Sequence, residues 1–311
     1  MRNLSVVTEF ILLGIPHTED LESMLFVLFL GFYIFTLMGN LLIPLAIISS
    51  TRLHSPMYFF LCQLSVCDIL FPSVSSAKML FYLSGNSRVI SYAGCVSQLF
   101  FYHFLGCTEC FPYTAMAYDR FVAICHPLHY TVTMSHRVCA ILAVGTSFFG
   151  CIQATFLPAL TFQLPYYGPN EVDYFFCDIP VMLKLACADT SALVMVGFIS
   201  VGLMPLSCFL LILTSYSCIV CSILQIQSTE GRRRAFSTCS AHLTAVLLFY
   251  MPVDLIYLRP TPSPWLDATV QILNNLVTPM LKPLIYSLRN KEVESSLRKV
   301  LHHLGFRPEQ L

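Results

Sequence analysis

Charged side chains inside long apolar stretches are the first candidates for chemistry in this sequence. Asp68, Glu109, Asp254 and Lys282 all lie among mostly apolar neighbours. A charge inside a bilayer is costly, so a residue that carries one there is by default a functional candidate with a partner to be identified.

A second pattern with chemical potential is His103, Cys107 and Cys110, which helical spacing puts on one face. An imidazole and two thiols could bind a soft metal such as Cu(I). Packing of small residues in a crowded bundle is the simpler interpretation. The sequence brings no nucleophile, base and orienting group together at helical spacing, so catalysis is a weak alternative and no cofactor is expected.

The elements that position these residues are expected to be membrane helices. Of 311 residues, 56% are hydrophobic and 11% are charged, whereas soluble domains usually carry roughly 25% charged residues. The formal net charge is zero, and the longest basic run is Arg232–Arg234, which gives a nucleic-acid partner little support. Most of the 14 cysteines lie in apolar stretches, where cysteine packs as a small hydrophobe.

Seven stretches are long and apolar enough to cross a bilayer core, which takes about 20 helical residues. They are Leu25–Ile48, Met57–Leu80, Gly94–Ile124, Val138–Leu160, Ser191–Leu224, Phe236–Leu258 and Ala268–Leu288. Asn290–Leu304 has apolar residues at helical spacing, which predicts an amphipathic helix on the membrane. The sequence therefore predicts an all-α membrane protein with an N-terminal segment (1–24), a seven-helix domain (25–288) and a tail (289–311).

Lysine and arginine near the helix ends predict the orientation. With the N-terminus outside, eleven fall on the inner side: Arg52, Arg120, Arg137, Arg232, Arg233, Arg234, Arg289, Lys291, Arg298, Lys299 and Arg307. Five fall outside: Arg2, Lys78, Arg88, Lys184 and Arg259. We expect an extracellular N-terminus, with the sequon at Asn3 available for glycosylation, and a cytoplasmic C-terminus.

Family motifs surround Arg120. Met116–Leu128 reads MAYDRFVAICHPL, which closely resembles the third-helix signature of odorant receptors. Further family motifs follow in order over essentially the whole chain: Gly39-Asn40, Leu53–Phe59, Ser215-Tyr216, Ala235–Cys239 with His242, and Pro279–Asn290. The resemblance implies a rhodopsin-like receptor of the plasma membrane that binds a small odorant and activates the olfactory stimulatory G protein to raise cyclic AMP.

For the inner end, the resemblance implies a switch made of Asp119, Arg120, Tyr216, His242 and Tyr286. Without it, Asp119 and Arg120 could be an interfacial pair that reaches out to water. With it, we expect Arg120 to pair with Asp119 in a closed state. In an open state Arg120 would meet Tyr216, Tyr286 or the G protein.

For the outer half, the resemblance implies a ligand pocket lined by Tyr102, His103, Gly106, Cys107, Cys110, Gly197, Ser200, Val201, Met204, Val253, Asp254, Tyr257, Ile272 and Asn275. Mostly apolar walls with a few polar groups suit a small, volatile, weakly polar ligand. His103 and Asp254 could hold an oxygen-bearing group of that ligand, or could bond to each other.

Two cysteines match the family's disulfide, which ties a long outer loop over the pocket: Cys95 and Cys177. The family usually adds a bridge within this loop. Tyr167 stands at the first cysteine of that bridge, so we expect Cys187 to be unpaired.

Lys282 stands where related receptors usually have asparagine, and by the family's arrangement it neighbours Asp68 and Glu109, which would otherwise share a sodium ion. Its ammonium could replace that ion, or it could disturb the bundle. Pro44 and Pro112 are further departures, and each can kink its helix.

Other membrane classes fit less well. The retinal lysine of opsins would correspond to Leu276, so Lys282 lies too deep for an opsin. Polar groups are too sparse for a channel, and no half-to-half repeat suggests a transporter.

Overall fold

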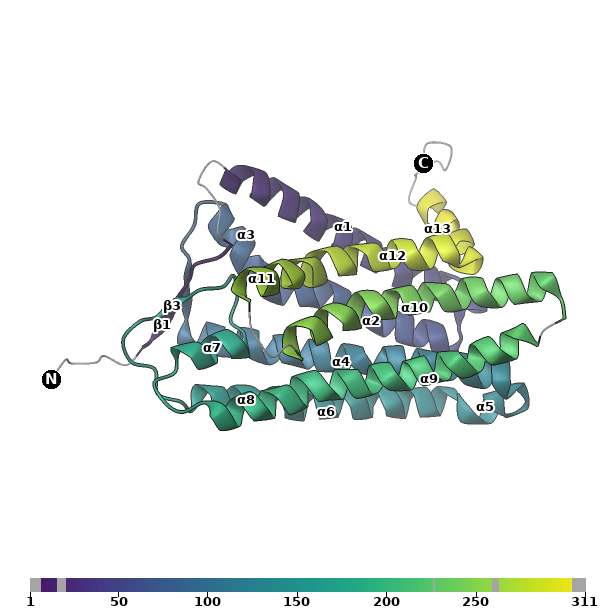
Figure 1. Ribbon diagram of the computed structural model, residues 1–311. Coiled ribbons are helices and arrows are strands. Elements are labelled where there is room, and N and C mark those ends of the chain that lie inside the picture. The colour runs from purple at the N-terminus through teal and green to yellow at the C-terminus, as the bar shows by residue number, and fades with distance from the viewer. Residues whose placement is uncertain (1–6, 16–20, 226, 259–262, 304–311) are drawn as a thin grey trace.

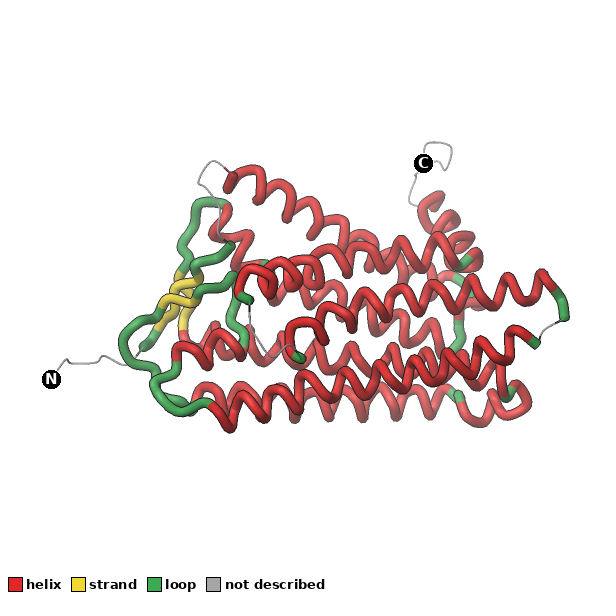
Figure 2. Tube along the Cα trace, in the orientation of Figure 1, coloured by secondary structure: helices red, strands yellow, loops and turns green. Residues whose placement is uncertain are grey.

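The computed structural model describes residues 7–15, 21–225, 227–258 and 263–303. Long helices run side by side, and a small sheet lies at the end of the bundle near the N-terminus (Figures 1 and 2). The α-helices are α1 (Glu22–Ser49), α2 (Pro56–Ser75), α3 (Ala77–Leu83), α4 (Tyr92–Cys125), α5 (Tyr130–Thr133), α6 (His136–Phe162), α7 (Ile179–Leu185), α8 (Ser191–Gly197), α9 (Met204–Leu224), α10 (Thr229–Tyr257), α11 (Pro264–Ile272), α12 (Thr278–Arg289) and α13 (Lys291–His303). Shorter helical turns are η2 (Thr51–Leu53) and η3 (Pro127–His129), and two π-helical segments are η4 (Phe198–Leu203) and η5 (Leu273–Val277).

The outward faces of the long helices are apolar. Ile48 of α1 is 71% exposed, and Val144 and Phe148 of α6 are 71% and 68% exposed. In the described residues, α1, α2, α6, the run 191–224 and most of α10 are long and apolar enough to cross a membrane. A helix that is apolar on all sides belongs in the core of a large protein or in a bilayer. Because these apolar faces are exposed, the chain is a multi-pass membrane protein.

The two other expected spans have a different character. α4 is 34 residues long but contains Glu109, Asp119 and Arg120, which make it more polar. The last expected span is divided into α11, η5 and α12. Neither is among the helices that length and composition alone identify.

Prolines act differently from helix to helix. Pro72 removes a backbone donor inside α2, and this helix ends three residues later at Ser75, so the expected span to Leu80 is broken before α3. α1 and α4 instead continue through Pro44 and Pro112. The expected effect of these two prolines is therefore at most a bend and not an interruption.

The three strands were not expected. β1 (Glu9–Leu12) lies between β2 (Val89–Ser91) and β3 (Glu171–Val172), antiparallel to the first and parallel to the second. Phe10 and Leu12 of β1 are fully buried. The prediction of an all-helical chain is therefore incomplete, because a four-residue strand that pairs with two distant segments leaves no clear periodic signal.

The C-terminal helix α13 packs against α1. The Ser296 hydroxyl donates to the Ala46 carbonyl oxygen over 2.7 Å, and Val293 is fully buried. The expected segment Asn290–Leu304 thus forms a helix with almost the predicted bounds, at the end of the bundle away from the sheet (Figure 1).

Candidate functional site

A cavity of about 60 Å³ lies in the half of the bundle that carries the sheet. α4, η4, α9, α10 and η5 form most of its wall, with one side chain each from α2 and α6. Its lining is mostly apolar and consists of Phe71, Tyr102, His103, Gly106, Cys107, Cys110, Gln153, Ser200, Val201, Met204, Pro205, Phe249, Val253 and Asn274.

The cavity brings together most of the side chains that the family resemblance implied. Those that line it are Tyr102, His103, Gly106, Cys107, Cys110, Ser200, Val201, Met204 and Val253. Gly197, Asp254, Ile272 and Asn275 are not among its described lining residues. The side chain of Tyr257 lies outside the described residues.

The π-helical segments explain part of this difference. A π turn holds more residues than an α turn, so it changes which side chains face a given direction. Gly197 precedes η4, and within η5 the residue that lines the cavity is Asn274 instead of Asn275. Regular helical periodicity could not reveal this shift, although two adjacent asparagines in an apolar span were a signal that one of them faces a site.

An aromatic layer that includes side chains of the loop 163–190 covers the cavity wall. The Tyr102 ring lies 4.8 Å from the Phe71 ring and 4.8 Å from the Phe176 ring, between centroids. Its hydroxyl donates to Gln271 Oε1 over 2.9 Å. Tyr174 of the same loop is buried, and burial raises the pKa of its phenol, which therefore stays neutral.

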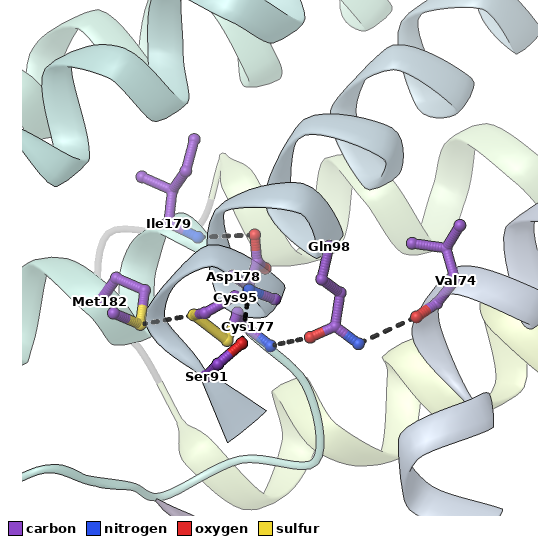
Figure 3. The surroundings of a disulfide bond; sticks show 9 residues. Val74, Ser91, Cys95, Gln98, Cys177, Asp178, Ile179 and Met182 are labelled. Carbon is purple, nitrogen blue, oxygen red and sulfur yellow. Dashed lines mark hydrogen bonds between the residues drawn. A yellow bond between two sulfur atoms is a disulfide. The ribbon is translucent and has the colours of Figure 1, made fainter. Parts of the chain in front are cut away.

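The disulfide between Cys95 and Cys177 fixes this loop to the start of α4, as predicted. Gln98, one turn further along α4, holds the same junction (Figure 3). Its Oε1 accepts from the Cys177 N–H over 2.9 Å, and its Nε2 donates to the Val74 carbonyl oxygen over 2.9 Å. One amide therefore connects α4, the end of α2 and the loop beside the disulfide.

His103 lies against the loop 163–190 and not against Asp254. Its Nε2 is 3.6 Å from Oδ1 of Asp178, and both side chains are buried. Asp178 also caps α7, since this Oδ1 accepts from the Ile179 N–H over 2.8 Å. Within the described residues, Oδ1 of Asp254 has no hydrogen-bond partner. A bond between His103 and Asp254, one of the two alternatives that the sequence left open, is absent from the described structure, and the carboxylate that lies beside His103 Nε2 belongs to the residue after the disulfide cysteine Cys177.

The possible metal site on α4 does not form a cluster of ligands. Cys110 Sγ is directed to the Gly106 carbonyl oxygen over 3.3 Å, while His103 and Cys107 line the cavity. Across the part of the chain that the structure describes, no group of three His, Cys, Asp or Glu side chains could hold a metal ion.

Lys282 lies between the two carboxylates that the sequence analysis expected. Its Nζ is 2.6 Å from Asp68 Oδ1 and also donates to Glu109 Oε1. All three side chains are at most 3% exposed. The ammonium also faces the rings of Tyr113 and Phe249, 5.4 and 5.5 Å from their centroids, within the range of a cation–π interaction. One cation thus joins α2, α4 and α12 in the centre of the bundle.

At the other end of α4, Arg120 does not pair with Asp119 in this structure. The Asp119 carboxylate accepts instead from the Tyr130 hydroxyl over 2.8 Å. The Arg120 guanidinium contacts the Met57 sulfur. Within the described residues, no ion pair joins Arg120 to Asp119. The guanidinium contacts only the Met57 sulfur there, which is a weak hydrogen-bond acceptor.

The remaining predicted switch residues gather on α9, α10 and α12. The Tyr216 hydroxyl and His242 Nδ1 are hydrogen-bonded over 2.6 Å. In the described structure, the buried hydroxyl of Tyr286 has no hydrogen-bond partner. Within the described part of the chain, neither tyrosine forms a hydrogen bond with Arg120.

The loop 163–190 also carries the predicted free thiol. Cys187 is unpaired and exposed, and its Sγ is 3.4 Å from the Tyr167 carbonyl oxygen. Tyr167 therefore lies beside Cys187, where the family's second bridge would require a cysteine. The predicted glycosylation site, Asn3, lies outside the described residues.

Comparison with known proteins agrees with this architecture. Residues 29–303 match the olfactory receptor family. The chain is 81% identical to olfactory receptor 10D1B of Mus musculus over the full length of both proteins. It is 68% identical to putative olfactory receptor 10D4 of Homo sapiens, covering 95% of this chain and 99% of that protein. It is 63% identical to human olfactory receptor 10D3, covering 99% of each. These relatives are receptors and not enzymes, and the chain itself belongs to the olfactory receptor family of class A G-protein-coupled receptors.

Proposed function

We propose that this receptor binds small, volatile, mostly apolar odorants in the cavity beside α4 and responds by activating the olfactory stimulatory G protein, which raises cyclic AMP. Membership of the olfactory receptor family supports odorant binding and G-protein coupling in general. The observation that carries the finer proposal is the cavity itself. Its apolar walls and few polar groups suit a weakly polar ligand.

The membrane arrangement that we propose has seven spans. They are α1, α2, α4, α6, the run from α8 to α9, α10, and the run from α11 to α12. α4 alone is 34 residues long, or about 51 Å at 1.5 Å per residue, more than a bilayer core needs. Residues 1–24 with Asn3 would be extracellular, and residues 289–311 cytoplasmic, with α13 along the inner surface of the plasma membrane.

Coupling between the two ends would use α4 as the shared element. His103 at the cavity and Arg120 at the inner end are 17 positions apart, or about 26 Å along the helix. Asp119, Arg120, Tyr216, His242 and Tyr286 would form the switch that opens the inner face to the G protein.

The size of the cavity supports a change of state on binding. Its volume of about 60 Å³ is well below the roughly 150 Å³ of an engineered cavity that holds benzene. An odorant of that size would have to widen the cavity. Because a ligand shifts an equilibrium only by binding one state more tightly, a wider open state would be favoured by ligand.

A panel of odorants on cells that express the chain with the olfactory stimulatory G protein tests this proposal. Ligand-dependent cyclic AMP, absent from cells without the receptor, is the expected result. A ligand-dependent ion current with unchanged cyclic AMP would overturn the proposal and favour a channel.

A further inference from the structure

Two polar side chains of the cavity already have partners within the protein. The Tyr102 hydroxyl donates to Gln271. Gln153 Nε2 donates to the Ser200 carbonyl oxygen over 3.1 Å. Because these groups already have partners, they have little to offer a ligand.

Two buried polar atoms on lining residues have no hydrogen-bond partner within the described part of the chain: His103 Nε2 and Asn274 Oδ1. The two residues are 6% and 5% exposed. An unsatisfied buried polar atom is costly and usually has a reason, such as a ligand that completes it.

The two atoms require different hydrogen-bond partners. His103 Nε2 lies 3.6 Å from the Asp178 carboxylate, so a movement of well under 1 Å would complete a hydrogen bond to the loop. The amide oxygen of Asn274 can only accept a hydrogen bond. In the described structure it has no donor, so a ligand that completes it must supply one.

We propose that the cavity selects ligands with a hydroxyl group, alcohols or phenols, and that this hydroxyl donates to Asn274 Oδ1. This inference rests on the proposed function, since it names the ligand class of the same cavity. Ethers, esters, ketones and aldehydes have only acceptors and would leave Asn274 Oδ1 unsatisfied. Ammonium ligands have donors, but none of the described lining residues is a carboxylate, and a buried unpaired charge is far more costly than a buried hydroxyl.

Pairs of isomers test the proposal without changing ligand size. Benzyl alcohol is an isomer of anisole, and 1-hexanol is an isomer of 1-methoxypentane. Binding to the purified full-length receptor is read from the ligand-dependent rise in its unfolding temperature, which needs no G protein. We expect each alcohol to bind about tenfold more tightly than its ether, because a site with an unsatisfied buried acceptor discriminates against a ligand without a donor.

Substitutions assign the preference to one atom. Asn274→Leu keeps the side-chain size and should reduce the alcohol-to-ether ratio to about one, and Asn274→Ala serves the same purpose if the leucine variant does not fold. Gln163→Leu, which removes an exposed amide at the end of α6 and outside the cavity, is the matched control. In that variant the alcohol preference should persist.

Equal binding of alcohols and ethers, no stabilisation by either alcohol, or a preference that survives in both Asn274 variants would overturn the proposal. Failure of the proposed function looks different. Alcohols that stabilise the receptor without raising cyclic AMP would contradict the receptor function and leave the ligand class standing. Equal cyclic AMP responses to an alcohol and its isomeric ether would contradict the ligand class and leave the receptor function standing.

Discussion

The Lys282 ammonium is surrounded by two carboxylates and two aromatic rings. A buried charge whose partner is removed costs about 3–5 kcal/mol. Asp68 and Glu109 come from two other helices, so this cation stabilises the packing of three helices at one point. The arrangement favours the interpretation that Lys282 takes the place of a sodium ion over the interpretation that it disturbs the bundle.

The first prediction is that the receptor's response does not depend on external sodium, because Nζ of Lys282 already occupies the space between the carboxylates. Lys282→Asn leaves the two carboxylates without their cation and should make agonist potency sodium-dependent. Cyclic AMP dose–response curves measure agonist potency for the parent receptor and for Lys282→Asn. They are recorded in medium that contains sodium and in medium where a bulky organic cation replaces it. Sodium dependence in the parent receptor, together with higher surface expression of Lys282→Asn, would contradict the interpretation.

Arg120 gives the second prediction. Its guanidinium contacts only the sulfur of Met57 among hydrogen-bonding groups described here, so its loss should cost the fold little. Arg120→Ala should therefore keep surface expression within a few-fold and remove agonist-dependent cyclic AMP. Arg137→Ala, at an exposed arginine at the start of α6, is the control that keeps the response. A full response in Arg120→Ala would remove Arg120 from the switch.

The sequence could identify charged residues that lie inside the apolar helices. Lys282, Asp68 and Glu109 are charges in apolar stretches, and their rarity there marks them as partners. The approach of His103 to Asp178 could not be predicted in this way. Their approach depends on how the loop 163–190 folds back over the bundle, and helical periodicity contains no information about that path.

At the scale of elements, the junction of α4, α2 and the loop 163–190 depends on more than the disulfide. Gln98→Leu removes both of its hydrogen bonds and leaves the buried Cys177 N–H and the Val74 carbonyl oxygen without this partner. Each buried group left unsatisfied costs about 1–3 kcal/mol. The third prediction is therefore a lower unfolding temperature of the purified receptor, with the disulfide still formed.

Gln163→Leu is the matched control for that experiment, because Gln163 is exposed at the end of α6. It should leave the unfolding temperature nearly unchanged. If Gln98→Leu and Gln163→Leu behave alike, the disulfide alone holds the junction.

Helices were predicted well where the 3.6-residue hydrophobic period continued along the sequence, and poorly where the helix geometry changed. α1 and α6 lie close to the spans that their apolar runs indicated. η4 and η5 are invisible to a 3.6-residue period, yet they change the side chains that face the cavity. Local propensity also gave no warning of β1, since its stability comes from pairing with segments far away in the chain.

At the scale of the whole molecule, the fourth prediction tests topology. Cys187 is a free, exposed thiol in the loop that the disulfide attaches to α4. If this end faces outward, a membrane-impermeant maleimide should label Cys187 on intact cells. Cys187→Ser should abolish the label, because the other exposed free cysteines, Cys151, Cys218 and Cys221, lie on apolar helices. Absence of labelling on a receptor detected at the cell surface would contradict this topology.

The pairing of β1 has a consequence for the order in which the receptor is made. Ile11 pairs with Glu171, 160 positions later in the chain. β1 is synthesised early. Its pairing with β3 becomes possible only after the segment that contains four of the long helices has been synthesised and inserted. Contacts between such distant segments form late in folding, since the chain between them must first be ordered. Closure of the three-stranded sheet is therefore a late step of biogenesis, and the full burial of Phe10 and Leu12 is completed only with it.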